Sequence, residues 1–174
     1  MTIRRADPAE IDRVAAFYEA VIDGTAGKPY APKWQKDIYP TREDLTRAVN
    51  SGEMYLAEAD GKILGAMVMN SRGSQGYASA PWTAAAEPEE VTVLHLLAVS
   101  PEAVRQGIGS VLVRFALEQS RAAGKKAVRL DVLVGNLPAD RLYRSLGFRF
   151  ICRVNLFYED TGWHEFDLFE YPLT

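Results

Sequence analysis

Apolar positions along this chain alternate between the two-residue period of strands and the longer period of helices. Helical spacing predicts helices that begin after residue 7, after residue 41, near residue 108 and at Pro138. Alternating or continuous apolar runs predict strands at 2–6, 54–59, 62–69, 91–99, 127–134, 149–159 and 163–171. The order β-α-α-β-β-β-α-β-α-β-β predicts an α/β protein with a mixed central sheet flanked by helices on both faces.

Capping residues and a turn dipeptide mark several element boundaries. Asp7 and Glu10 have the spacing of a capping box at the start of the first helix. Thr41 and Asp44 repeat that spacing before the second helix. Asp60-Gly61 stands between two strand-like runs, and this dipeptide is typical of a tight hairpin.

The most informative stretch is V-R-Q-G-I-G-S, from Val104 to Ser110. Gly107 and Gly109 fall where the strand 91–99 gives way to a helix. The unpaired N–H groups and the dipole of a helix N-terminus suit an anionic phosphate, and glycine leaves those amides accessible. A simple turn is the alternative for this run alone. The helix is expected to bury Ile108, Val111, Leu112, Phe115 and Ala116.

This glycine loop differs from two common phosphate motifs. A P-loop requires Lys followed by Ser or Thr after its last glycine, and this pair is missing. A dinucleotide fingerprint requires a third glycine, and that position is Leu112. The loop must therefore be interpreted together with the residues on its C-terminal side.

A second block, G-N-L-P-A-D-R-L-Y-R-S-L-G-F, runs from Gly135 to Phe148. Together with the loop, and with a helix and a strand between them, it resembles the GCN5-related N-acetyltransferase family. The tail from Tyr158 to Tyr171 resembles a bacterial branch of that family whose acceptor is not assigned. The family's loop reads [RQ]-x-x-G-x-[GA] after a strand ending V-x-P. This chain departs from that pattern at Val104, where the family has Arg or Gln, and its arginine is displaced by one residue to Arg105. The family's second block, N-x-x-A-x-x-L-Y-x-x-x-G-F, is matched by Asn136, Ala139, Leu142, Tyr143, Gly147 and Phe148.

The resemblance implies an enzyme that transfers an acetyl group from acetyl-CoA to a primary amine of a small molecule or amino acid, by direct attack in a ternary complex. It implies that the backbone of Leu97, Ala98 and Val99 holds the pantetheine arm. A non-catalytic acyl-CoA-binding or sensing domain, and an enzyme for a longer acyl group, are the alternatives. The other implied cofactor-binding residues are Val104, Arg105, Gln106, Gly107, Ile108, Gly109, Ser110, Asn136, Ala139 and Tyr143.

Two residues are candidates for proton transfer. Tyr143 matches the family's general acid, and a phenol is protonated at neutral pH. The alternative is a tyrosine packed in the core. His95 is the candidate base, because strand alternation places it on one face with Val93 and Leu97. The alternatives are a buried structural histidine and a water-relayed base such as Glu53 or Glu58.

Asn136 and Cys152 each allow two interpretations. If Pro138 is the first helical residue, Leu137 is the cap, and the Asn136 amide is available to the cofactor rather than to the helix. An asparagine in a turn is the alternative. Cys152 lies on a predicted strand, which favours a core cysteine over an acyl-cysteine nucleophile.

The acceptor pocket is expected where two segments that lack regular patterns, 24–39 and 70–90, meet the open end of the strand 91–99. Their aromatic residues either line that pocket or cover the core. The acidic balance of the second segment favours a small cationic or neutral amine. The candidate substrate-binding residues are Trp34, Tyr39, Tyr77 and Trp82.

Composition narrows the function further. The 174 residues carry a net charge of −3, whereas nucleic-acid-binding domains are usually basic, so the charge does not indicate nucleic-acid binding. One cysteine and two distant histidines predict neither a disulfide nor a local metal motif. No apolar run approaches the length of a membrane span. We therefore expect a single domain over residues 1–174 that is cytoplasmic, metal-free, monomeric or homodimeric, and partnered by acetyl-CoA and a small amine.

Overall fold

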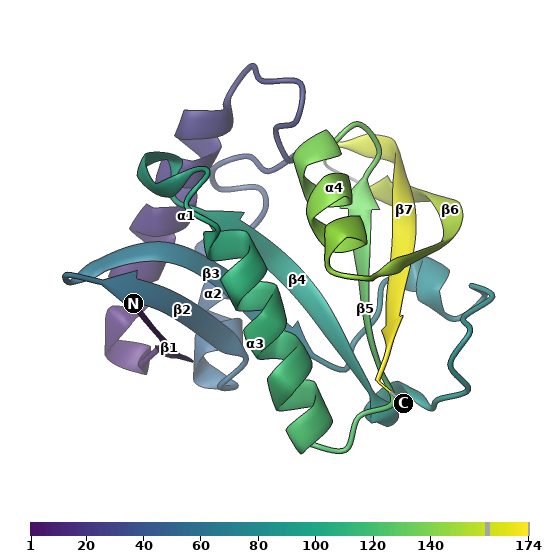
Figure 1. Cartoon of the computed structure of the whole chain (residues 1–174). Coiled ribbons are helices and arrows are strands. Elements are labelled where there is room, and N and C mark those ends of the chain that lie inside the picture. The colour runs from purple at the N-terminus through teal and green to yellow at the C-terminus, as the bar shows by residue number, and fades with distance from the viewer. Residues whose placement is uncertain (159–160, 174) are drawn as a thin grey trace. The chain divides into compact units, whose positions relative to one another are not determined.

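The computed structural model describes residues 1–158 and 161–173. Its elements follow the predicted order, and most bounds agree within two residues (Figure 1). The predicted turn at 160–162 and the last residue of the strand 149–159 lie partly outside the described residues. The elements are β1 Thr2–Arg5, α1 Ile11–Thr25, α2 Arg42–Asn50, β2 Met54–Ala59, β3 Lys62–Asn70, β4 Val91–Val99, α3 Ile108–Ala122, β5 Ala127–Leu133, α4 Leu137–Ser145, β6 Arg149–Tyr158 and β7 Gly162–Pro172.

The chain divides into two compact units, and β4 and α3 each contribute residues to both. Unit 1 comprises Met1–Met69 and His95–Val113, and unit 2 comprises Asn70–Leu94 and Arg114–Thr174. The strands are ordered β1-β2-β3-β4-β5-β7-β6 in a mixed seven-stranded sheet. This confirms the predicted fold class.

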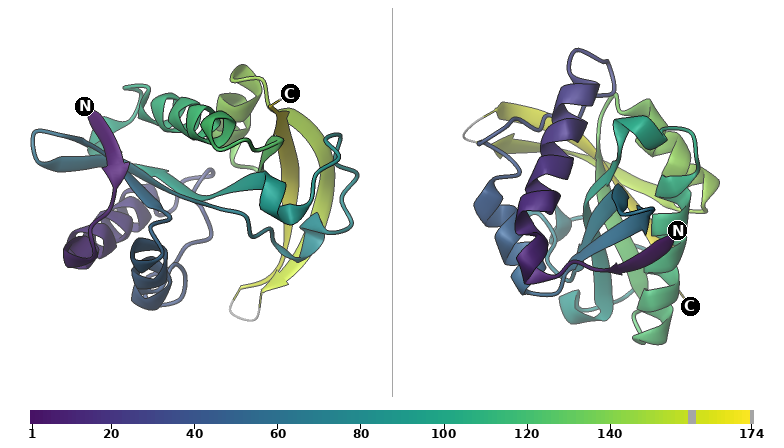
Figure 2. Two further views of the ribbon diagram at one scale, coloured as in Figure 1. Left: turned by 90° about the horizontal axis from the view of Figure 1, so that it is seen from below. Right: turned by 90° about the vertical axis from the view of Figure 1, so that its left-hand side faces the viewer.

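Unit 1 is built on the antiparallel strands β1, β2 and β3. The Asp60-Gly61 turn has positive φ at both residues, which confirms the predicted hairpin. In Figure 2, α1 and α2 lie on one face of these strands, and the part of α3 that belongs to unit 1 lies on the other. Both predicted capping boxes are present, at Asp7–Glu10 and at Thr41–Asp44.

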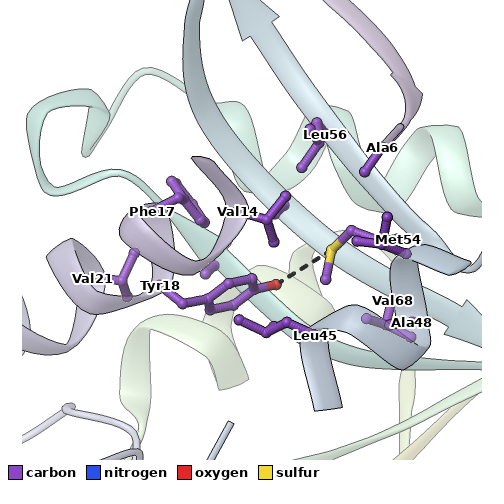
Figure 3. Packing of buried hydrophobic residues seen from close by; sticks show 13 residues of the cluster. Ala6, Val14, Phe17, Tyr18, Val21, Leu45, Ala48, Met54, Leu56 and Val68 are labelled. Atoms are coloured by element: carbon purple, nitrogen blue, oxygen red, sulfur yellow. Dashed lines mark hydrogen bonds between the residues drawn. The ribbon is translucent and has the colours of Figure 1, made fainter. Parts of the chain in front are cut away.

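The core of unit 1 lies between the helices α1 and α2 and the strands (Figure 3). Tyr18 is its largest fully buried side chain, and its hydroxyl reaches the sulfur of Met54. The apolar face of α1 is made of residues that recur at helical spacing, and this pattern is what predicts the helix from the sequence. The buried members of this face are Val14, Phe17, Tyr18 and Val21.

The buried face of α3 differs from the prediction at two positions. Val111 is 38% exposed and Phe115 is only half-buried, whereas Val113 and Leu117 are buried. The observed stripe keeps a spacing of four and five residues, so its centre lies slightly further round the helix than the sequence pattern suggested. Its members are Ile108, Leu112, Val113, Ala116, Leu117 and Ser120.

Unit 2 contains β5, β7 and β6 as an antiparallel set, with β5 also paired in parallel to the start of β4. Leu168 and Phe169 are successive residues of β7 and therefore point to opposite faces. Phe169 contacts Tyr143 of α4, whereas Leu168 packs with Tyr77 of the irregular segment 70–90. The helix α4 and the segment 70–90 thus cover opposite faces of these strands.

A charge network fixes the start of α1 against β1 and β2. Arg4 contacts the carboxylates of Glu10 and Glu58 at 2.7 Å each, and Arg13 contacts both carboxylates as well. Hydrogen bonds from Arg4, together with the backbone amide of Asp7, lower the pKa of Glu10 to about 2 despite partial burial. The carboxylate is therefore more stable in the folded state than in the unfolded chain.

This shift predicts a pH-dependent contribution to stability. Because the folded pKa is depressed, the contribution is present above the ordinary value of 4.5 and is lost as the pH falls toward about 2. Glu10→Gln should flatten the unfolding free energy in this window, measured by urea titration at successive pH values. Glu19→Gln is the control, because Glu19 is an exposed carboxylate of α1 outside this charge network. An unchanged slope in Glu10→Gln would contradict the assignment.

Candidate functional site

The glycine loop has the backbone geometry of an anion-binding turn. Arg105 and Gly107 both have positive φ, 67° and 77°, and they flank Gln106. Left-handed residues interspersed in a turn direct successive N–H groups toward one side. The first helical hydrogen bond of α3 runs from the Val111 amide to the Gly107 carbonyl. The amides of Ile108, Gly109 and Ser110 therefore precede the helical ladder.

Close packing beneath the loop sets the position of the α3 N-terminus. A Cβ on Gly65 of β3 would lie 2.8 Å from Ile108 Cγ2 and 2.9 Å from Leu112 Cδ1. The absent side chain lets the first turn of α3 pack directly on the strand. A Cβ on Gly24 of α1 would overlap the Pro101 ring, so the approach to the loop is equally tight. The loop is thus held by contacts within unit 1.

The strand β4 is irregular at Leu96, whose φ is +51°. This conformation interrupts the alternation of side chains after His95, so the expected common face does not extend from Val93 and His95 to Leu97. The Leu96 carbonyl accepts a hydrogen bond of 2.7 Å from the buried hydroxyl of Tyr18. This bond stabilises the irregular backbone just before Leu97, Ala98 and Val99.

Asn136 is the N-cap of α4, which corrects the expectation that Leu137 occupies that position. The side-chain oxygen of Asn136 accepts from the Ala139 amide at 3.3 Å, because α4 begins at Leu137 and not at Pro138. Leu137 is 59% exposed. The side-chain oxygen of Asn136 therefore caps the helix. A contact from this side chain to acetyl-CoA would be made by its amide nitrogen.

Tyr143 is buried at 6% exposure between α4 and the strands. Its ring packs edge-on against Phe148 at 5.5 Å and near Phe169 at 6.5 Å. Burial, and secondly the negative charge of Asp131, raise the pKa of its phenol well above the ordinary value. The hydroxyl makes no hydrogen bond to the described residues. The group is held in the protonated form, which is the form that a proton donor requires.

Asp131 is a candidate that the sequence reasoning missed. It lies on β5, and one of its carboxylate oxygens accepts a hydrogen bond of 2.7 Å from the Tyr77 hydroxyl. Its charge raises the pKa of both Tyr77, where burial is the larger cause, and Tyr143. The available signal was that Arg129 and Asp131 are the two charged residues of an otherwise apolar strand.

The four aromatic candidates fall into different places. Tyr77 and Trp82 lie together in unit 2, with ring centroids 5.2 Å apart, and line one pocket. Trp34 belongs to unit 1 and packs against Tyr18 beside the core. Tyr39, also in unit 1, is 43% exposed. Two of the four residues are thus brought to a common cavity.

Known acetyltransferases are similar to this chain in sequence and in fold. The family model described as the Acetyltransferase (GNAT) family matches residues 16–148, and this chain belongs to that family. The predicted family is confirmed. Members of the family use acetyl-CoA, and the matched range includes the glycine loop, β5 and α4.

Relatives of known sequence include acetyltransferases of different lengths. A mycothiol acetyltransferase from Acidothermus cellulolyticus is 32% identical over 114 residues, which make up 63% of this chain and 35% of that protein. The chain thus spans about a third of that relative. An uncharacterized N-acetyltransferase from Archaeoglobus fulgidus is 30% identical over 149 residues, 86% of this chain and 93% of that one.

Solved structures share the fold at lower identity. A GNAT-family acetyltransferase from Streptococcus agalactiae superposes with a TM-score of 0.80 at 20% identity, covering 98% of this chain and 94% of that one. The acetyltransferase YncA from Salmonella typhimurium, solved with its cofactor acetyl-CoA, gives 0.73 at 18% identity, covering 100% and 94%. These likenesses establish the fold.

Within residues 1–158 and 161–173, no three His, Cys, Asp or Glu side chains are grouped so that they could hold a metal ion. No helix in the same ranges combines the length and apolar character that a membrane crossing requires.

Gly107 allows a direct test of the loop. Apart from Gly107 itself and its two chain neighbours, no atom of the described residues lies within 4 Å of a Cβ built on Gly107, so the space beside this backbone is open to a ligand. Gly107→Val should weaken acetyl-CoA binding by about 10- to 100-fold in calorimetry, because a side chain at positive φ costs about 1–3 kcal/mol and distorts the amides.

Gly61→Val is the matched control, since Gly61 also has positive φ (73°) and open space around its Cβ but lies in the β2–β3 turn. It should carry similar backbone strain without loss of acetyl-CoA affinity. Circular dichroism checks that both variants fold. Equal affinity of the two variants would contradict a role for the loop in binding.

Proposed function

We propose that this protein transfers the acetyl group of acetyl-CoA to a primary amine by direct attack in a ternary complex. The observation that carries the proposal is the pair of polar groups in unit 2: the buried, protonated phenol of Tyr143, and the carboxylate of Asp131 whose charge acts on it. An acetyl transfer to an amine needs one group that donates a proton and one that accepts a proton.

The glycine loop supports the binding half of this proposal. Backbone N–H groups at the start of α3 can hold a pyrophosphate without a cationic side chain. The departure at Val104, which is 58% exposed, therefore removes one side-chain contact and leaves the amides from Arg105 to Ser110 in place. The irregular strand after Leu96 supplies the backbone of Leu97, Ala98 and Val99 for the pantetheine arm.

The chemical step moves two protons. The amine nitrogen forms a bond to the acetyl carbonyl carbon, and the bond from that carbon to the sulfur breaks. The sulfur leaves as a thiolate and takes the phenolic proton of Tyr143. The nitrogen loses one proton to a base, for which Asp131 and His95 are the two candidates. Asp131 is the better supported, because Tyr77 holds its carboxylate in place and it lies within electrostatic reach of Tyr143.

Tyr143→Phe tests the proton donor. The variant keeps the ring contacts with Phe148 and Phe169 but cannot protonate the leaving thiolate. We expect kcat to fall by about 10²–10⁴-fold with little change in acetyl-CoA affinity. The release of free thiol with the best amine found gives kcat, and calorimetry gives the affinity. Wild-type turnover in this variant would make Tyr143 a packing residue.

Asp131→Asn and His95→Ala separate the two candidate bases. If Asp131 accepts the proton, Asp131→Asn should lower kcat/KM by about 10²–10⁴-fold at every pH from 6 to 9. If His95 accepts it, kcat/KM of the wild type should rise through an ionisation near 6.5, and His95→Ala should abolish that rise.

A melting temperature near that of the wild type shows that Asp131→Asn still accepts the Tyr77 hydrogen bond. Full activity in both variants would exclude both residues as the base. A protein that binds acetyl-CoA but acetylates no amine in a broad screen would instead be the sensing domain.

A further inference from the structure

A pocket of about 400 Å³ lies wholly within unit 2, beneath the irregular segment 70–90. Val91 and Val93 of β4 and Arg129 of β5 form its floor, and Tyr77 and Trp82 contribute aromatic walls. We propose that this pocket receives the body of the acceptor, and that the acceptor is a small hydrophobic primary amine carrying one hydroxyl or carbonyl group. This inference rests on the proposed acetyltransferase function.

The aromatic walls are fixed before any ligand arrives. The Trp82 indole N–H donates to the Tyr77 carbonyl at 2.8 Å, and the Tyr77 hydroxyl donates to Asp131 at 2.7 Å. Both polar groups are used within the protein, so the ring surface that lines the pocket offers apolar contact. Rigid aromatic walls favour an apolar body because little conformational freedom is lost when it binds.

The floor of the pocket carries a charge that is neutralised within the protein. The Arg129 Nε contacts Glu170 at 3.0 Å, its Nη2 donates to the Ala84 carbonyl, and its guanidinium lies 4.4 Å from the Trp82 ring. Glu170 is fully buried. Because the pair is neutral overall, the pocket does not select strongly for an anionic ligand, which agrees with the expected neutral or cationic amine.

One polar atom of the pocket has no partner. The Ser74 hydroxyl is buried and makes no hydrogen bond to the described residues. Buried hydroxyl groups are nearly always paired, so the ligand is expected to bring a hydroxyl or carbonyl group to this position. A purely hydrocarbon amine would leave Ser74 unsatisfied.

The pocket is also placed correctly for the reacting nitrogen. Arg129 and Asp131 are two residues apart on β5, so they lie on the same face, about 7 Å apart along the strand. Tyr77 spans both positions, since its ring lines the pocket and its hydroxyl contacts Asp131. An amine whose body lies against Tyr77 can therefore direct its nitrogen toward the Asp131 carboxylate.

The test compares ethylamine, phenethylamine and tyramine as substrates with acetyl-CoA. Saturation-transfer NMR measures the binding of the same three amines in the presence of unacetylated CoA. We expect kcat/KM for phenethylamine to exceed that for ethylamine at least tenfold. Ala78→Leu places a larger side chain at a residue that lines the pocket and should remove this advantage. Ala85→Leu is the matched control, because Ala85 is an exposed alanine of the same segment outside the lining.

The polar part of the proposal has its own variant. Tyramine should bind about 3- to 10-fold more tightly than phenethylamine, and Ser74→Ala should remove that difference. If tyramine has no advantage, or keeps it in Ser74→Ala, the polar contact is wrong.

The outcomes also separate this inference from the proposed function. Equal acetylation of ethylamine and phenethylamine, or a preference that survives Ala78→Leu, overturns the pocket and leaves the acetyltransferase intact. Binding of phenethylamine that Ala78→Leu abolishes, without acetylation of any amine, supports the pocket and overturns the function. If the protein neither binds nor acetylates any of these amines, both the pocket proposal and the proposed function are overturned.

Discussion

Glu170 is completely buried, and its carboxylate is satisfied by groups from two distant parts of the sequence. One oxygen contacts Arg129, and the other accepts from the hydroxyl and amide of Thr83 and from the Ala84 amide. Removing one member of a buried pair leaves a charge without a partner and typically costs about 3–5 kcal/mol. The irregular segment 70–90 therefore has a fixed course over the strands although it contains only two short 3-10 turns.

The consequences extend from this ion pair to the candidate chemistry. Arg129 lies under Trp82, Trp82 is hydrogen-bonded to Tyr77, and Tyr77 is hydrogen-bonded to Asp131. Each contact limits the freedom of the next side chain. A carboxylate held in this way loses little entropy when a substrate approaches, which is the physical advantage of preorganised polar groups.

The glycine loop illustrates a different means of recognition, in which the backbone supplies the contacts. The positive φ values at Arg105 and Gly107 and the close packing at Gly65 determine where the amides lie. Side chains in the loop can then vary, as they do at Val104, without changing the N–H groups. This explains why a chain that departs from the family's loop pattern at one position still belongs to the family.

The sequence by itself determined the order of elements, both capping boxes, the Asp60-Gly61 hairpin and the glycine loop, because each depends on residues only a few positions apart. Tertiary structure decided what depends on distant partners. The Tyr77–Asp131 hydrogen bond joins residues that are 54 positions apart in the sequence. The Tyr18–Leu96 hydrogen bond spans 78 positions, and the Thr83–Glu170 hydrogen bond spans 87. No local pattern specifies which pairs of polar side chains meet across such separations. The sequence therefore predicted the place where acetyl-CoA is expected to bind, whereas only the fold revealed the contact of Asp131 with Tyr77 and the aromatic pocket.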